Sequence, residues 1–121
     1  MSRVMHFEIQ ASKLLEPMAF QTELLGRKFS NWDLHNHWLI ATGAANEPGS
    51  NGALLPRPRV KGDSKRWINA FVCSAHVASL DATLSTATAL GAEIVFAKVP
   101  VPGVGRLAYI EDLDGNVFEL N

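Results

Sequence analysis

The stretch MHFEIQASKLLEPMAFQTELLG, Met5 to Gly26, decides the fold that we expect. Its first part alternates between two kinds of side chain, which is typical of a β-strand, and we place this strand at Arg3–Gln10. Ser12 is the predicted N-cap of a helix, and Gly26 ends the helical spacing of the leucines that follow. The polar positions of the strand are His6, Glu8 and Gln10.

The second half of the chain starts this order again. A strand is expected over Trp67–Val77, Ser79 is the predicted N-cap of a second helix, and Gly91 ends it. Three more strands are predicted after each helix: Lys28–Trp32, His37–Thr42, Asn51–Leu55, Glu93–Ala97, Val104–Ile110 and Val117–Leu120. The segment between the last two is the turn Asp112–Gly115, and Lys98–Gly103 is expected to be a loop. The order β-α-β-β-β therefore occurs twice.

This repeated order predicts an α+β fold of two βαβββ modules. Paired side by side, the modules give a curved mixed sheet with the helices outside and an open concave cleft, where ligands bind. The length of 121 residues fits one domain, 1–121. We expect module 1 at about 1–56, a linker rich in proline and charge at about 57–65, and module 2 at about 66–121.

Charge and composition exclude several classes of partner. The formal net charge is −1, which does not favour nucleic acid or an anionic membrane surface. The apolar runs are too short to span a bilayer, and the N-terminus lacks the apolar core of a signal peptide. Cys73 is the only cysteine, so an internal disulfide is ruled out, and we expect it to be a small buried apolar residue. We expect a cytoplasmic protein.

Five segments resemble the vicinal-oxygen-chelate superfamily, which includes glyoxalases, bleomycin-resistance proteins and extradiol dioxygenases. The resemblance covers nearly the whole chain, and these segments are its most specific parts: Met5–Ile9, Asn51–Pro58, Asn69–Cys73, Pro102–Ile110 and Asp114–Leu120. Together they look like the small single-domain glyoxalase-like proteins. The resemblance implies the fold described above, but it leaves the activity open because such folds host unrelated chemistries.

Catalytic members of this superfamily hold a divalent metal with one side chain from each of four strands. His6 matches the first position and Glu119 the last. The two middle positions offer only side chains that cannot bind a metal: Gly52, Ala53 or Leu54 on one strand, and Phe71 or Val72 on the other. Catalytic zinc normally keeps three protein ligands, so the sequence predicts an incomplete site.

Several roles for the two end residues remain open. Glu8 lies two residues after His6 on the same strand face and could be a third ligand. Alternatively, His6 is a hydrogen-bonded residue that lines the pocket, or His6 and Glu119 form an acid and base pair without metal. We favour no cofactor over a divalent metal.

Other residues are candidate ligand contacts or metal-binding side chains. Trp38 could form an aromatic wall, Glu8 and Glu119 could supply negative charge, and Arg106 could enter the cleft and pair with an anionic substrate. The spacing of His35 and His37 is compatible with adventitious metal binding, but a turn and edge-strand role is favoured. His76 is expected to be at the surface or at the entry to a helix.

Three functions follow, and the first is preferred. The protein binds a small organic compound, aromatic or cationic, in its cleft without a complete four-ligand metal site. Alternatively, it is a metal-dependent lyase, isomerase or dioxygenase that uses His6 and Glu119, or an enzyme that uses this pair without metal. A homodimer is expected because a cup-shaped chain exposes sheet edges and an apolar face. The sequence does not identify the ligand.

Overall fold

The computed structural model describes residues 2–32, 36–58, 68, 71–101 and 105–121. It contains eight strands and two helices in the predicted order among these residues. The elements of module 1 are β1 (Val4–Ala11), α1 (Leu15–Leu25), β2 (Lys28–Asn31), β3 (Trp38–Ala41) and β4 (Gly52–Pro56). Those of module 2 are β5 (Phe71–Ala75), α2 (Leu80–Ala89), β6 (Glu93–Val101), β7 (Gly105–Glu111) and β8 (Val117–Leu120).

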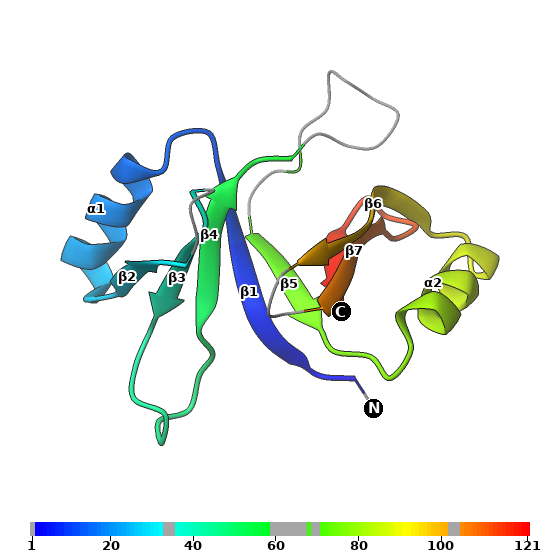
Figure 1. Ribbon diagram of the computed structural model, residues 1–121, viewed down its shortest axis with the longest axis horizontal. Coiled ribbons are helices and arrows are strands. Elements are labelled where there is room, and N and C mark those ends of the chain that lie inside the picture. Colours follow the sequence, from blue (N-terminus) through cyan, green and yellow to red (C-terminus); the bar gives the residue numbers. More distant parts are fainter. Residues whose placement is uncertain (1, 33–35, 59–67, 69–70, 102–104) are drawn as a thin grey trace.

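All the strands form one mixed sheet in the order β2-β3-β4-β1-β5-β8-β7-β6. Each module begins with a strand that pairs in parallel with the last strand of the same module: β1 with β4, and β5 with β8. The antiparallel pair β1 and β5 joins the modules at the centre of the sheet. Figure 1 shows α1 and α2 at opposite ends of the molecule, one beside each half of the sheet. The predicted α+β fold of two βαβββ modules is confirmed.

Two local predictions are wrong. The strand β6 continues through Val101, where a loop was expected, because its backbone pairs with β7 as far as Gly105. Ser12 does not cap α1: the N-cap is Leu14, with no side-chain hydrogen bond, and Ser12 Oγ accepts from Arg57 Nη1 at 3.1 Å. A tertiary contact has therefore replaced the expected local one.

The N-cap predicted for the second helix and the glycines predicted to end both helices agree with the structure. Ser79 caps α2 by accepting a hydrogen bond from the backbone N–H of Ala82 at 3.2 Å. Gly26 has a φ of 65° and Gly91 a φ of 98°, and such left-handed backbone favours glycine at the end of a helix. No helix among the described residues is long and apolar enough to cross a bilayer.

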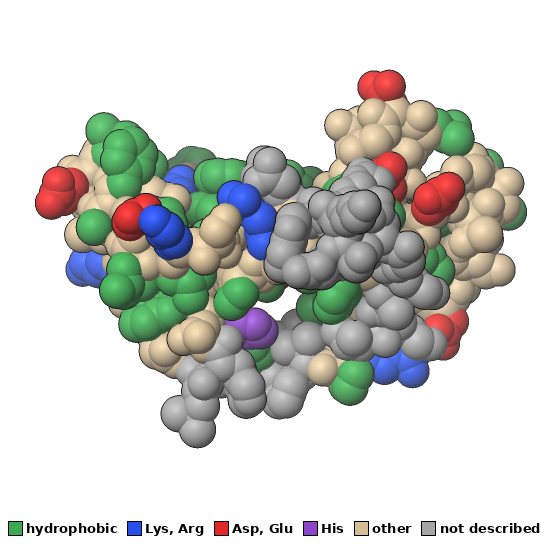
Figure 2. Space-filling view, turned by 90° about the horizontal axis from the view of Figure 1, so that it is seen from above, with side chains coloured by type: hydrophobic (Ala, Val, Ile, Leu, Met, Phe, Trp, Pro, Cys, Tyr) green, Lys and Arg blue, Asp and Glu red, His purple; other side chains and the backbone are tan. Residues whose placement is uncertain are grey.

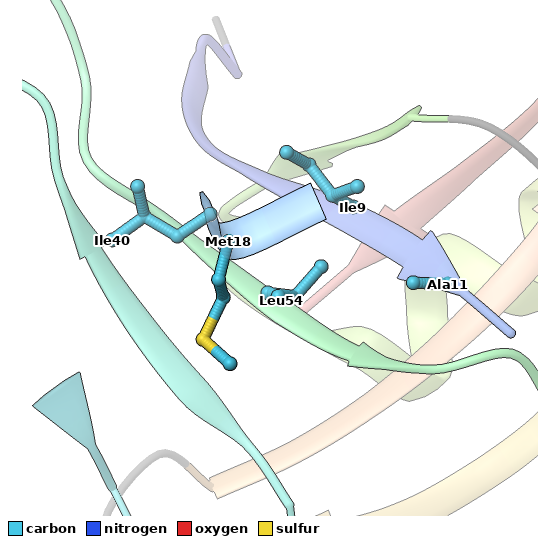
Figure 3. Close-up of a cluster of buried hydrophobic side chains, with 5 residues drawn as sticks. All are labelled: Ile9, Ala11, Met18, Ile40 and Leu54. Atoms are coloured by element: carbon cyan, nitrogen blue, oxygen red, sulfur yellow. The ribbon is translucent and has the colours of Figure 1, made fainter. Parts of the chain in front are cut away.

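One face of the β1 half of the sheet packs against α1. Figure 3 shows the buried side chains that fill this layer: Ile9, Ala11, Met18, Ile40 and Leu54. Leu54 is fully buried. Gly52, beside this layer, has no room for a side chain, since a Cβ there would lie 2.6 Å from the Phe7 ring and from the Phe7 carbonyl oxygen. Close packing of β1 on β4 therefore requires glycine at this position.

In module 2 each face of the sheet carries a layer of buried apolar side chains. The layer under α2 is built on Leu84, Ala108, Ile110 and Leu120. The layer on the opposite face is built on Ile68, Val72, Val95 and Tyr109. Tyr109 belongs to this second layer through its ring, while its hydroxyl group reaches the polar side chains described next.

Candidate ligand-binding site

Four polar side chains lie in one row across the middle of the sheet. The strand register places His6 of β1 opposite Ser74 of β5, Ser74 opposite Glu119 of β8, and Glu119 opposite Tyr109 of β7. Directly paired residues of neighbouring strands project from the same face of a sheet. The row therefore brings together side chains that are up to 113 positions apart in the sequence.

Strand β1 adds two more polar side chains to this face. Glu8 and Gln10 follow His6 with the period of two that places alternate residues on one side of a strand. We call the six residues the polar cluster: His6, Glu8, Gln10, Ser74, Tyr109 and Glu119. Its members other than the half-buried His6 are at most 7% exposed. Such burial of polar groups is costly unless they are hydrogen-bonded.

A chain of hydrogen bonds connects most of the cluster. Gln10 Nε2 donates to the Tyr109 hydroxyl at 3.1 Å, and that hydroxyl donates to Glu8 Oε1 at 2.5 Å. The side chains of Glu8 and Glu119 share a hydrogen bond. Asn121 Nδ2 donates to Glu119 Oε1 at 2.8 Å, beside the cluster. The two carboxyl groups are thus held in fixed positions from both ends.

Burial makes Glu8 a neutral acid at neutral pH. Desolvation is the largest cause and raises the pKa of Glu8 to about 9, and the hydrogen bond and the negative charge of Glu119 raise it further, against the opposing hydrogen bond from Tyr109. Desolvation, followed by the effects of Glu8, also raises the pKa of Tyr109. A protonated Glu8 can donate to Glu119, so the pair of carboxyl groups holds one proton and one negative charge.

His6 lies at the edge of the cluster in its neutral form. Desolvation by burial lowers the pKa of His6, and the charge of Glu119 opposes this shift. A neutral imidazole has one N–H donor and one acceptor nitrogen. The structure thus brings the two predicted end residues, His6 and Glu119, within electrostatic reach of each other.

Two buried oxygens of the cluster have no hydrogen-bond partner among the residues that the structure describes. They are Gln10 Oε1 and Ser74 Oγ. Gln10 is 2% exposed and Ser74 is fully buried. Unsatisfied buried polar atoms are rare in folded proteins, and a catalytic role, a bound water or an ion is the ordinary explanation.

The described residues do not fit a four-ligand metal site. They contain no group of three or more His, Cys, Asp or Glu side chains arranged to hold a metal ion. The residues that pair with Glu8 on the neighbouring strands are Ala53 of β4 and Val72 of β5, which cannot bind a metal. Glu8 instead bonds to Tyr109 and Glu119, so a third-ligand role has no support in this arrangement.

Two other predicted contacts lie apart from the polar cluster. Trp38 pairs with Leu54 and packs on the apolar layer beneath α1, on the face of the sheet opposite Glu8. Arg106 forms an ion pair with Asp81 of α2, with Nη2 3.1 Å from Oδ1. The ligand contacts that we assigned to these two residues stay predictions, and this placement does not support them.

The remaining histidines and the cysteine are also outside the cluster. His37 stacks on the Trp32 ring, with centroids 6.0 Å apart, and His35 lies outside the described residues. His76 is exposed, and its Nδ1 is 3.2 Å from Asn121 Oδ1. Cys73 is exposed, so the prediction that it is buried is wrong: on β5 it projects from the face opposite Val72 and Ser74.

A shallow groove occurs elsewhere on the molecule, between α1 and β2. Its volume is about 450 Å³, and it is open to solvent. The side chains around it include Met18, Thr22, Glu23, Arg27 and Phe29, and none belongs to the polar cluster. The groove and the cluster are therefore separate candidates for a ligand.

Sequence reasoning missed three members of the cluster. Gln10 was the easiest to find, because it alternates in phase with His6 and Glu8. Tyr109 and Ser74 carry no local signal, since their partners come from other strands. His6, Glu8 and Glu119 were the predicted residues that the structure brings together.

Solved structures with the same fold are known, although sequence comparisons find no relative. No protein-family model matches the chain, and no curated protein sequence matches it. Among solved structures, methylmalonyl-CoA epimerase from Mycobacterium tuberculosis is 18% identical, with a TM-score of 0.63 over 96% of this chain and 84% of that one. A hypothetical protein, BH1468 from Bacillus halodurans C-125, is 15% identical, with a TM-score of 0.62 over 98% and 92%.

A third structure is a methylmalonyl-CoA epimerase from Streptomyces coelicolor in complex with 2-nitronate-propionyl-CoA. It is 15% identical, with a TM-score of 0.64 over 98% of this chain and 92% of that one. At these identities the likeness concerns the fold and not the activity. The fold that the resemblance in the sequence implies is confirmed at that level: the chain has the fold of these methylmalonyl-CoA epimerases.

Proposed function

We propose that this protein binds a small organic molecule at the polar cluster, without a complete four-ligand metal site. One observation carries the proposal: a buried, hydrogen-bonded pair of carboxyl groups lies beside two buried oxygens that lack partners among the described residues. Binding sites combine a largely apolar wall with a few converging polar groups. Val72 and the Tyr109 ring belong to a buried apolar layer on this face.

Stability alone is a poor explanation for this cluster. Buried ionic groups contribute less to stability than apolar side chains of similar size, because desolvation offsets their attraction. The opposite face of the same sheet shows that this chain can fill such a layer with apolar residues. Local departures from the rules of stable packing are expected where a site performs a function.

The binding test uses the melting temperature of the full chain with three probes of different chemistry. They are methylmalonyl-CoA, which one structural neighbour binds, benzyltrimethylammonium as an aromatic cation, and butylammonium as an aliphatic amine. A probe at ten times its Kd adds about 1.4 kcal/mol, or roughly 5 °C for a domain of this size. We expect at least one probe to produce a saturable rise.

Two matched variants place the bound probe. Glu119→Gln removes a carboxylate from the polar cluster and should abolish the rise. Glu23→Gln makes the same chemical change beside the groove between α1 and β2 and should leave it unchanged. No rise with any probe, or a rise that Glu23→Gln removes and Glu119→Gln keeps, would contradict the proposal.

A second candidate function, proton transfer without metal, is favoured by the unequal state of the two carboxyl groups. The pKa of Glu8 is raised to about 9, its side chain is hydrogen-bonded to Glu119, and two neighbouring carboxyl groups in different environments are a common acid and base arrangement. This candidate predicts exchange of the α-proton of methylmalonyl-CoA for solvent deuterium, lost in Glu8→Gln and in Glu119→Gln. If the wild type shows no exchange, the proton-transfer function is contradicted and the binding function remains.

The metal-dependent alternative makes a different prediction. A site that uses His6 and Glu119 requires a stoichiometric divalent metal in the purified protein, lost in both His6→Ala and Glu119→Gln. Elemental analysis separates the cases. Metal at one equivalent per chain, lost in both variants, would overturn the part of the proposal that excludes a complete metal site.

We also propose a homodimer. Large apolar side chains on α1 are exposed to solvent, and hydrophobic surface is visible at this end of the molecule, on the left of Figure 2. They are Leu15, Phe20, Leu24 and Leu25. Contiguous apolar surface on a small domain usually marks an interaction site. Light scattering at micromolar concentration should give twice the mass of one chain, and a single-chain mass would contradict the dimer.

A further inference from the structure

We propose that the ligand of the polar cluster carries a primary ammonium group, bound between the Ser74 hydroxyl and the Glu8 and Glu119 pair. This inference rests on the proposed function and names the chemical class of its ligand. It follows from the balance of hydrogen-bond donors and acceptors in the cluster, from its charge, and from its geometry.

Acceptors outnumber available donors on this face. Three donors on this face already have acceptors: Gln10 Nε2 donates to Tyr109, the Tyr109 hydroxyl to Glu8, and Asn121 Nδ2 to Glu119, whereas the Ser74 hydroxyl has no partner among the described residues. What is left is mainly acceptor capacity, on Gln10 Oε1, Ser74 Oγ and the carboxyl oxygens. A ligand that fits this surplus must bring N–H or O–H donors.

The charge of the cluster points to a cation. The carboxyl pair carries one negative charge, and its two members are 7% and 3% exposed. No lysine or arginine of the described chain forms an ion pair with either of them. Burial lowers the pKa of His6, so the imidazole does not neutralise the pair at neutral pH. A buried negative charge without a partner is unfavourable, and a bound cation relieves it.

The geometry favours an ammonium over other cations. Ser74 lies between His6 and Glu119 in the row, so its unpartnered hydroxyl is on the same face of the sheet as the carboxylate. An –NH₃⁺ group has three directed donors, which suit a hydroxyl and two carboxyl oxygens. A hard divalent cation instead requires six or more oxygen ligands, or several retained waters, and the described residues provide no metal-binding group.

The cluster also suggests how the rest of the ligand is oriented. Gln10 lies four residues beyond His6 on β1, roughly 13 Å away by strand rise. Its unpartnered Oε1 is therefore at the far end of the cluster from Ser74. A molecule that lies along β1 would place its ammonium at the row and its body beside Glu8.

Three probes of equal chain length test the inference by calorimetry on the full chain at pH 7. Butylammonium has both charge and N–H donors, butyltrimethylammonium has charge alone, and butanol has one neutral donor. We expect butylammonium to bind at least tenfold more tightly than either of the others. Equal affinity for the two cations, or for butylammonium and butanol, would overturn the ammonium assignment.

Three variants locate the site. Ser74→Ala removes the unpartnered hydroxyl and should weaken butylammonium binding at least tenfold in a folded protein, as verified by its melting temperature. Glu119→Gln should weaken it further, and Glu23→Gln in the α1 groove should leave it unchanged. Unchanged affinity in Ser74→Ala would contradict the proposed position, even if Glu119→Gln fails to fold.

The ammonium assignment and the proposed function can fail separately. If butylammonium does not bind while methylmalonyl-CoA or the aromatic cation stabilises the wild type and not Glu119→Gln, the polar cluster is a binding site and the ammonium assignment is wrong. If no probe stabilises the wild type, both are contradicted.

Discussion

The two faces of β1 are both buried but are built from opposite kinds of residue. On the side of α1, Phe7, Ile9 and Ala11 pack into an apolar layer with residues from α1, β2, β3 and β4. On the other side, His6, Glu8 and Gln10 enter a network of hydrogen bonds that reaches β7 and β8. One strand therefore separates a layer that stabilises the fold from a layer whose residues are costly to bury.

The apolar layer on one face of β1 serves stability, whereas the polar layer on the other face serves a purpose other than stability. The apolar layer follows the ordinary rules of dense packing, with Leu54 fully buried and Gly52 fitted under the Phe7 ring. The polar layer holds two carboxyl groups and two oxygens without partners among the described residues. Substitutions on the two faces should therefore have effects of different size and kind.

The largest effect is expected in the apolar layer. Leu54→Ala should lower the free energy of unfolding by about 3 kcal/mol, because it removes buried methyl groups and leaves a cavity. Urea denaturation followed by circular dichroism measures this change. Leu113→Ala, at a side chain that is 82% exposed, is the matched control and should change the free energy by less than about 0.5 kcal/mol. Equal losses in the two variants would contradict the assignment of the layer.

The next effect is expected at the centre of the polar layer. Tyr109→Phe keeps the ring but removes the hydroxyl that joins Gln10 to Glu8. It should cost about 2 kcal/mol, because two buried polar groups lose their partner. The same denaturation experiment applies, and a loss below about 0.5 kcal/mol would show that the network contributes little to holding the carboxyl groups.

The pH dependence of stability should distinguish the two faces without changing a residue. The pKa of Glu8 is raised from 4.5 to about 9 in the folded chain, so its contribution is complete below about pH 4.5 and is lost as the pH rises to 9. Between pH 7 and 9 stability should fall by up to about 1.4 kcal/mol per pH unit. The pKa of His6 is lowered in the folded chain, so below pH 6.5 this residue has the opposite effect: stability rises as the pH rises.

The Glu8→Gln variant is the control for this pH profile. Its amide can replace the protonated carboxyl group as a donor to Glu119 and as an acceptor from Tyr109, so the variant should fold. Its stability between pH 7 and 9 should be flatter than that of the wild type. An equally steep fall in both proteins would mean that another group causes it.

The smallest effect should occur at Ser74. The hydroxyl is buried and makes no hydrogen bond to a described residue, so Ser74→Ala should change the free energy of unfolding by less than about 0.5 kcal/mol. Ala11→Ser brings a hydroxyl into the apolar layer instead and should cost about 1–3 kcal/mol. Similar losses in the two variants would show that the Ser74 hydroxyl is satisfied within the folded chain.

The sequence predicts the fold better than it predicts the site. The signals for the fold are local: side chains alternate along each strand, a glycine ends each helix, and the order β-α-β-β-β is repeated. The strands, both helices and the fold class could therefore be recognised. The site depends on register between distant strands: Ser74 faces His6 and Glu119 only because β5 lies between β1 and β8. No local pattern contains that information.

Tertiary contacts also explain the predictions that were wrong. Ser12 has the chemistry of a helix cap, but Arg57 binds it. Cys73 is apolar, but it falls on the exposed face of β5 because Val72 and Ser74 occupy the other. In both cases contacts between distant parts of the chain decided the outcome, and no local pattern reports them.

The central claim is that Glu8 is a neutral acid held beside Glu119 in a buried site. The most direct measurement follows the ¹³C signal of the Glu8 carboxyl carbon against pH in labelled protein, assigned with Glu8→Gln. The structure predicts a midpoint near pH 9, because burial and the neighbouring carboxylate disfavour a second charge. A midpoint near 4.5, the ordinary value, would contradict it and would show that the two carboxyl groups ionise independently.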